Sequence, residues 1–487
     1  MRRSPLPPVV LLPLAGIALL SLAGCGRFDP GRMAGVATGF VSHQMCSATF
    51  VSGLDPQAFY REAVAPTTRP IDPLLSHRID HDRGEVTVTL AGMAESRAAY
   101  RGPLGCLVLH DPPPAAEPIE RTPPATPLLP PIAGPALVEP ATPALKVALD
   151  RAFEETSAPP HRRTKAIVVV HNGRIVAERY APGVGIDTPL IGWSATKSVM
   201  NALTGILVRQ GRLSLHGPAP VAAWSDPNDP RHAISVDNLL RMTSGLDLGN
   251  SLTAGPSDLI DPSSQMLFDE RDMAGFAERA RLKAAPGTSW AYANGNTLLL
   301  SRLVRDKASN GASNGASNGA SNGAGGNAAA TLAFARRELF DRLGMTNVTL
   351  EFDAVGTPVG SSHMLAPARD WARFGMLYLD DGMVGGTRLL PEGWVDYSAA
   401  PTPGSERFGY AAGFWTNRGD STGARHRTRL GLPTDSFMAR GAFGQYVIVV
   451  PSRRLVVARF GISHSHDNDM ATVARLVADV IAATDIE

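Results

Sequence analysis

The sequence predicts an α/β domain in which an antiparallel sheet is flanked by helices and carries an inserted helical subdomain, with a small module in front of it. Three observations support this prediction. Hairpin-like strand pairs and helical patterns stand near both ends of residues 144–487, which is typical of one sheet flanked by helices. Residues 215–435 are helical and loop-rich, with little strand signal. A proline-rich stretch over 112–143 predicts a semi-rigid linker after the module at 25–111.

The first residues are typical of an exported protein. A short positive segment precedes an apolar run over 9–22, which is broken by Pro13 and followed by small residues and Cys25. This pattern resembles a bacterial lipoprotein signal, so we expect a signal peptide over 1–24 and a lipid on Cys25. A plain signal peptide and an N-terminal membrane helix remain open. Gly26 after the cysteine favours the bacterial cell envelope, at the periplasmic face of the outer membrane.

Cysteine usage agrees with export. The chain has three cysteines, and if Cys25 is lipidated, Cys46 and Cys106 remain as an even pair. We predict a disulfide between them, with two buried free thiols as the alternative. Residues 85–90 alternate apolar and polar side chains, which predicts a half-buried strand in this module. The module could bind a partner, act as a lid, or fold onto the main domain as a spacer.

The main domain begins near Ala144. A β-branched run, an Asn172-Gly173 turn and a second run predict a hairpin, and Gly211 is a suitable stop for the helix that starts at Ser194. The expected elements are a helix over 144–155, strands over 165–170 and 174–180, a second hairpin with strands over 446–450 and 455–460, and a final helix over 470–483.

An Ala-Ser-Asn-Gly tetrad repeats four times from Ala308 to Gly323. It holds no apolar residue larger than alanine and cannot bury a core. We therefore expect a disordered surface loop over 308–327 without a function of its own.

Composition excludes several classes of function. The 487 residues carry a net charge of +1, which gives no indication of a nucleic acid or an acidic polymer as partner. We expect no cofactor. His464 and His466, with Asp467 and Asp469, fit a solvated cap before the last helix better than a metal site, because no further cluster offers a third and fourth ligand.

The most informative motif is Ser194-Ala195-Thr196-Lys197. Its spacing puts a hydroxyl and an amine one helical turn apart on the same face. A helix N-terminus also favours developing negative charge. Ser194 is therefore a candidate nucleophile and Lys197 a candidate base, provided that burial lowers the pKa of the amine. A simple N-cap and a solvated lysine are the alternative.

Three further segments stand in a matching order: 238–246, the Tyr292-Ala293-Asn294 triplet before an apolar helix, and the glycine-rich strand entry at 440–446. Together with Ser194 and Lys197 they resemble the serine β-lactamase-like and penicillin-binding superfamily. Within it, the chain is most similar to class C β-lactamases, family-VIII-type esterases and 6-aminohexanoate-dimer hydrolases. Segments 339–345 and 367–375 add to the resemblance, which covers residues 144–487.

The resemblance implies a β-lactamase/transpeptidase-like fold and an acyl-enzyme on Ser194. Tyr292 would donate a proton to the leaving group and activate the deacylating water, and either Lys197 or Tyr292 would accept the serine proton. Asn294 would bind Lys197 or the acyl amide of the substrate. The oxyanion hole would use the N–H of Ser194 and an N–H after Gly441, which is Ala442.

The third motif departs from the family, where Lys-Thr-Gly or His-Thr-Gly helps to bind a substrate carboxylate. Here Ala439-Arg440-Gly441 stands in that place, and Arg440 could replace the charge or point away. We therefore expect a serine hydrolase acting on a small-molecule ester or amide. A D-amino-acid peptidase or β-lactamase of the envelope, and an acyl sensor that no longer turns over, are the alternatives. The sequence gives no oligomeric state.

Overall fold

The computed structural model describes residues 29–111, 119, 124–252, 261–309, 327–465, 467 and 469–484. The predicted signal peptide over 1–24, the lipid on Cys25 and most of the repeat loop lie outside the described residues. Within the described part of the chain, no helix is long and apolar enough to cross a membrane.

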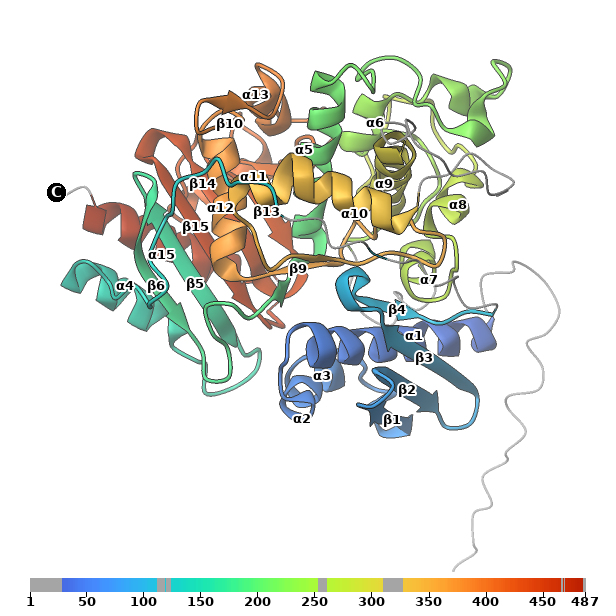
Figure 1. Ribbon diagram of the computed structural model, residues 1–487, viewed down its shortest axis with the longest axis horizontal. Helices are drawn as coiled ribbons and strands as arrows, with labels where there is room; N and C mark the ends of the chain where they lie inside the picture. The colour runs from blue at the N-terminus through green and yellow to red at the C-terminus, as the bar shows by residue number, and fades with distance from the viewer. Residues whose placement is uncertain are drawn as a thin grey trace, which may run out of the picture.

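The N-terminal module is a helical layer on a four-stranded antiparallel sheet of order β1-β2-β3-β4 (Figure 1). Its first helix begins where Asp29 accepts the N–H of Gly31, with Pro30 at the first helical position. The elements are α1 (Pro30–Cys46), α2 (Pro56–Phe59), α3 (Ala65–Thr67), β1 (Leu75–Asp80), β2 (Glu85–Leu90), β3 (Ala94–Tyr100) and β4 (Cys106–Val108). The predicted strand over 85–90 is confirmed, and a disulfide joins Cys46 to Cys106 as predicted.

The catalytic domain is built on a six-stranded antiparallel sheet of order β12-β13-β14-β15-β5-β6. The strands are β5 (Thr164–His171), β6 (Arg174–Tyr180), β12 (Trp415–Thr416), β13 (Phe437–Gly441), β14 (Gln445–Val450) and β15 (Leu455–Gly461). Both predicted hairpins are confirmed. The first turns at Asn172 and Gly173, whose φ angles of 47° and 84° fit the turn that an Asn-Gly pair favours.

Helices cover both faces of this sheet. Ile167 and Val169 of β5 pack with α4 (Pro143–Phe153) and α15 (Met470–Thr484), whereas Val168 and Val170 pack with α12 (Ala368–Leu379). Burial on both faces explains why β5, β14 and β15 read as almost continuous apolar runs. Figure 1 shows α4 and α15 together at one side of the sheet. The predicted flanking helices are thus confirmed.

The region predicted as helical carries most of the remaining helices. Before it stands α5 (Thr196–Arg209), and within it are α6 (Val236–Leu240), α7 (Pro262–Phe268), α8 (Met273–Glu278), α9 (Asn294–Ser309), α10 (Ala328–Ala335), α11 (Asp341–Leu343), α13 (Trp394–Ala399) and α14 (Thr422–Arg429). Short strands accompany them: β7 (Leu190–Ile191), β8 (Thr349–Leu350), β9 (Met364–Ala366), β10 (Met383–Val384) and β11 (Thr387–Arg388). Strands of two or three residues are too short to show an alternating pattern, so the sequence did not reveal them.

The described part of the proline-rich stretch is extended, as expected, but it is bound to the catalytic domain. The N–H of Ile175 donates to Ile132 O, and the N–H of Ala141 donates to Val176 O, each at 2.9 Å. Because β6 is an edge strand, its outer N–H and C=O groups are free to bind this segment. Arg369 also donates to the carbonyl oxygen of Gly134 at 2.8 Å. The described residues of this stretch therefore act as a strap along the sheet edge.

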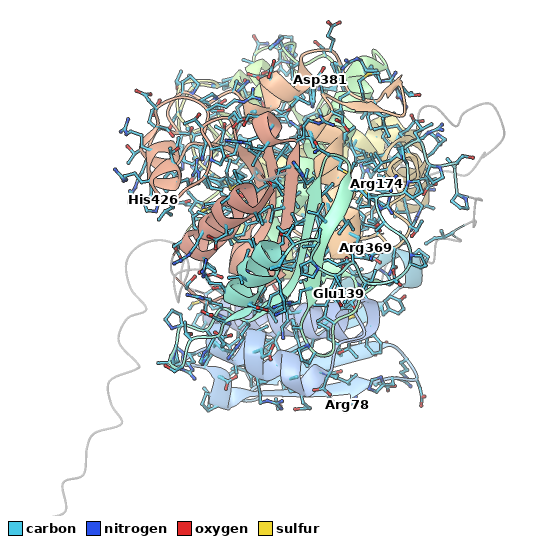
Figure 2. All side chains as sticks on the ribbon, turned by 90° about the vertical axis from the view of Figure 1, so that its left-hand side faces the viewer. Arg78, Glu139, Arg174, Arg369, Asp381 and His426 are labelled. Atoms are coloured by element: carbon cyan, nitrogen blue, oxygen red, sulfur yellow. A yellow bond between two sulfur atoms is a disulfide. The ribbon has the colours of Figure 1, made fainter. Side chains whose placement is uncertain are left out.

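The N-terminal module lies as a separate layer against the catalytic domain. Figure 2 shows it below that domain, with Arg78 of β1 at its far edge and Asp381 at the opposite end of the molecule. The module packs through α1, which contacts α7, and through the 3-10 turn Gly102–Leu104, which contacts β8 and α10. It thus folds onto the main domain, which was one of the three roles left open by the sequence.

Candidate active site

Ser194 lies on a tight turn at the entry to α5. It belongs to the 3-10 turn Trp193–Ala195, which leads directly into the helix. Trp193 has φ +47°, in the left-handed region that a side chain larger than glycine rarely adopts. Such backbone strain persists only where the surroundings hold it, and it concentrates at functional sites.

Lys197 lies one turn further along α5, and its side chain is buried. Its Nζ is 3.0 Å from Ser194 Oγ, 2.6 Å from Asn294 Oδ1 and 2.8 Å from the carbonyl oxygen of Ser361. Burial lowers the pKa of this amine from its usual range to about 7. A substantial fraction of Lys197 is therefore neutral at physiological pH.

The partners of Lys197 fit a neutral amine. Asn294 Oδ1 and Ser361 O can only accept hydrogen bonds, so they take the two N–H groups of an –NH₂. The third partner, the Ser194 hydroxyl, can either donate or accept. When the amine is neutral, its lone pair therefore faces Ser194, and the hydroxyl proton can point at it.

Tyr292 faces the same serine and is also buried, with 3% of its surface exposed. Burial raises the pKa of its phenol to about 12, although a hydrogen bond with Ser194 and the charge of Arg440 partly offset this rise. The ring packs edge-on against Tyr410, and Lys197 Nζ lies 4.9 Å from its centroid. At neutral pH, Tyr292 therefore carries its proton next to the nucleophile.

Asn294 is the first residue of α9. Its backbone N–H donates to Ser251 Oγ at 3.0 Å, while its side chain accepts from Lys197. The structure therefore places Asn294 on the lysine, one of the two partners that the resemblance allowed.

The end of β13 touches the nucleophile turn. A Cβ on Gly441 would lie 2.1 Å from the carbonyl oxygen of Gly192 and 3.0 Å from Trp193 Cβ. The φ angle of Gly441 is −121°, which any residue can adopt. It is therefore the close contact, and not the backbone conformation, that requires glycine here. Ala442, the next residue, therefore has its backbone beside the serine turn.

The side chain of Arg440 is held by contacts within the protein. Its guanidinium lies over the rings of Trp415 and Tyr446, 5.3 and 5.7 Å from their centroids, and donates to the carbonyl oxygen of Asp467 at 3.0 Å. These contacts set the direction of the guanidinium.

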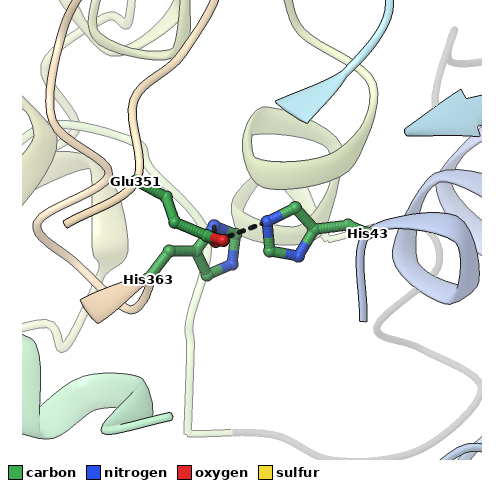
Figure 3. A group of neighbouring side chains, drawn as sticks. All are labelled: His43, Glu351 and His363. Carbon is green, nitrogen blue, oxygen red and sulfur yellow. Dashed lines mark ion pairs between the residues drawn. The ribbon is translucent and has the colours of Figure 1, made fainter. Parts of the chain in front are cut away.

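Three buried side chains, His43, Glu351 and His363, bring metal-ligand atoms within 4.8 Å of one another (Figure 3). The two imidazole rings are stacked, with centroids 4.1 Å apart and planes 21° apart. A metal binds in the plane of each ring, and nearly parallel stacked rings direct their lone pairs side by side instead of to one point. The arrangement fits an ion pair between His43 Nε2 and Glu351 Oε2, 2.7 Å apart, better than a metal centre.

The histidine cluster near the C-terminus has structural contacts where it is described. His464 Nε2 lies 2.8 Å from the carbonyl oxygen of Glu62, and Asp469 pairs with Arg459 at 2.8 Å. Asp467 accepts the N–H of Ala471 at the start of α15, as expected for a cap. His466 lies outside the described residues.

Sequence reasoning missed two groups at this site. Nothing in the pattern pointed to the Ser361 carbonyl, because any residue offers a carbonyl and only the fold decides where it points. Trp193 was also missed as a strained residue, since backbone angles cannot be read from a residue name. Ser194, Lys197, Tyr292 and Asn294, by contrast, lie together, and the end of β13 lies beside the serine turn.

Comparisons with known proteins place this geometry in a family. Residues 149–481, more than half of the chain, match the family model Beta-lactamase. The 6-aminohexanoate-dimer hydrolase of Paenarthrobacter ureafaciens is 26% identical over 265 residues, which cover 51% of this chain and 58% of that protein. The match thus spans less than two thirds of this relative's length.

Solved structures share the fold. A putative 6-aminohexanoate-dimer hydrolase from Bacillus anthracis superposes with a TM-score of 0.53 at 20% identity, covering 67% of this chain and 80% of that one. A penicillin-binding protein homologue from Caulobacter crescentus gives 0.50 at 15% identity, over 72% of this chain and 99% of that one. Because the family model matches more than half of the chain, the chain belongs to the beta-lactamase family, whose members are serine hydrolases that act on amides and esters.

Proposed function

We propose that this protein hydrolyses a carboxylic ester or a small amide through an acyl-enzyme on Ser194. The observation that carries the proposal is the set of partners around Lys197: two fixed acceptors and one hydroxyl, in a site where burial lowers the pKa of the amine to about 7. This environment favours Lys197 over Tyr292 as the acylation base, because the phenol holds its proton up to about pH 12.

In the first step, Ser194 Oγ attacks the substrate carbonyl and its proton passes to Lys197 Nζ. The negative charge on the carbonyl oxygen is stabilised by the N–H groups of Ser194 and Ala442. Tyr292 then gives its phenol proton to the departing oxygen or nitrogen. The acyl-enzyme is left beside a lysinium and a tyrosinate, which balance each other in charge.

In the second step, the Tyr292 phenolate takes a proton from a water molecule, and the hydroxide attacks the acyl carbon. Ser194 Oγ leaves and recovers its proton from Lys197 Nζ. The acid is released and both side chains return to their starting states, so atoms and charges balance over the cycle.

The surroundings of Arg440 support a substrate other than a β-lactam. Its guanidinium lies over two aromatic faces and donates to a carbonyl oxygen, a setting that differs from the lysine or histidine of the family's usual third motif. This favours esters and small amides over β-lactams and D-amino-acid peptides. The name of the Paenarthrobacter relative makes the 6-aminohexanoate dimer a reasonable amide to test.

The test is hydrolysis of p-nitrophenyl butyrate and of the 6-aminohexanoate dimer by the full-length protein and by Ser194→Ala. We expect the variant to remain folded and to lose turnover. The exposed Ser225→Ala is the matched control and should keep full activity. Activity that survives in folded Ser194→Ala would contradict the proposal. A wild-type protein that only accumulates a stable acyl adduct would instead favour the acyl sensor.

A further inference from the structure

The N-terminal module contacts the catalytic domain next to the loop whose Ser361 carbonyl binds Lys197. The contact centres on Glu351, which is completely buried. Its Oε1 accepts the hydroxyl of Ser47 at 2.8 Å and the backbone N–H of Cys106 at 2.9 Å, and its Oε2 lies 2.7 Å from His43 Nε2. The module therefore supplies all three of these partners to one carboxylate (Figure 3 shows the histidine contact).

The disulfide holds these partners together. Ser47 follows Cys46, and the second donor is the backbone of Cys106 itself, so the bond fixes the two segments that clasp Glu351. A Cβ on Gly105 would lie 2.5 Å from Glu351 Cγ, which shows how closely the module backbone approaches the side chain. Both hydrogen bonds to Glu351 Oε1 therefore form only when the segments around Cys46 and Cys106 are in place.

Glu351 in turn holds the loop that carries the Ser361 carbonyl. Its backbone N–H donates to His363 O at 2.9 Å, and its carbonyl accepts from Val359 N–H at 2.8 Å. His363 N–H closes the loop onto Val359 O at 2.9 Å. Ser361 stands in the middle of this loop, with its carbonyl 2.8 Å from Lys197 Nζ. The ring of His363, at the end of this loop, stacks on the ring of His43, which belongs to the N-terminal module.

We infer that Glu351 is a positioning residue. Held by the N-terminal module, it fixes the Ser361 carbonyl against Lys197 and so keeps the lysine lone pair directed at Ser194. This inference rests on the proposed function, because it assigns Lys197 the role of base. It makes the disulfide-linked module a working part of the active site, with a role beyond that of a spacer.

The effect should appear in the pH dependence. The titratable groups that face Lys197 are Tyr292, ahead of α9, and His363, ahead of β9, while Arg440 of β13 acts on Tyr292. The pKa of His363 is well below its usual range because of burial and the nearby His43 and Lys197, so it stays neutral. If the loop shifts, water reaches Lys197 and the cost of charging it falls. Its pKa then rises.

The experiment measures kcat/KM for p-nitrophenyl butyrate against pH in the full-length protein and in Glu351→Gln. We expect the midpoint of the acidic limb to move upward by about one pH unit, which corresponds to about tenfold lower kcat/KM on the acidic side. The control is Glu62→Gln, which removes another ion pair between module and domain, Glu62 Oε2 to Lys165 Nζ at 2.6 Å. It should leave the midpoint unchanged.

Ser47→Ala is the milder variant, since it removes one hydrogen bond from the module side only. If Glu351→Gln fails to fold, Ser47→Ala decides, and we expect a smaller shift in the same direction. An unmoved midpoint in a folded variant overturns the inference, as does an equal shift in Glu62→Gln. Failure of the proposed function is seen separately, because it would leave the wild-type activity independent of Ser194.

Discussion

At the scale of single residues, burial shifts the pKa values of Lys197 and Tyr292 in opposite directions. Both side chains are buried, and burial disfavours the charged form of each. The charged form of lysine is protonated and that of tyrosine is deprotonated, so the pKa of the amine falls and that of the phenol rises. The amine loses its proton near pH 7, while the phenol keeps its proton to about pH 12. In the proposed mechanism, this difference makes Lys197 the base and Tyr292 the acid beside Ser194.

Tyr292→Phe should lower turnover of an amide at least about a hundredfold, because the departing nitrogen then lacks its proton donor. The loss in the acylation step should be smaller with p-nitrophenyl butyrate, since p-nitrophenolate leaves without a proton. Burst-phase kinetics on the ester and steady-state rates on the amide check this. Equal losses in acylation for both substrates would remove Tyr292 from the role of leaving-group acid.

At the scale of elements, the site depends on how closely β13 approaches the turn before α5. Gly441 makes the contact with Gly192 possible, and through it Ala442 reaches the side of the serine. The strand is held by β14 and the turn by α5, so two rigid elements define the position of the proposed oxyanion donors.

Gly441→Ala should damage both stability and activity, because the new Cβ would meet a carbonyl oxygen at 2.1 Å. We expect a loss of about 1–3 kcal/mol in unfolding free energy, the usual cost of overpacking, and a fall in kcat. Denaturant unfolding and ester hydrolysis measure the two effects. Gly134→Ala is the control, since its Cβ would meet nothing within 4 Å. Full activity in Gly441→Ala would mean that β13 need not approach the turn so closely.

At the scale of the whole molecule, the N-terminal module and the strap both fasten onto the catalytic domain. The module is closed by the Cys46–Cys106 disulfide and docks on Glu351, and the strap binds the edge of β6. The chain thus wraps two sides of the catalytic domain before that domain begins at α4.

Removing the disulfide should destabilise this arrangement. For Cys46→Ala/Cys106→Ala we expect a loss of about 2–5 kcal/mol in the stability of the module, because the bond closes a loop across a sequence separation of 60. Thermal unfolding of the variant, and of the wild type with and without a reductant, checks this. A wild type whose unfolding is indifferent to reductant would show that the bond adds little to the fold.

The sequence by itself determined the family, the main hairpins, the terminal helices and the disulfide pair. These rest on local patterns: the β-branched runs around Asn172-Gly173, the apolar face after Ser194, and the parity of Cys46 and Cys106. It also gave the catalytic candidates, since Ser194, Lys197 and Tyr292 sit in motifs with a recognisable order. The lipid on Cys25 remains a prediction.

Only the tertiary structure supplied the burial and the contacts on which the proposed acid and base assignments and the proposed role of the module rest. A pKa depends on burial, and neither the burial of Lys197 nor the direction of the Ser361 carbonyl leaves a trace in the local sequence. The contacts on Glu351 come from Ser47 and Cys106, which stand 304 and 245 positions away in the chain, and such contacts have no periodic signature. Local patterns fix elements, whereas the electrostatics of a site arise from side chains that only packing brings together.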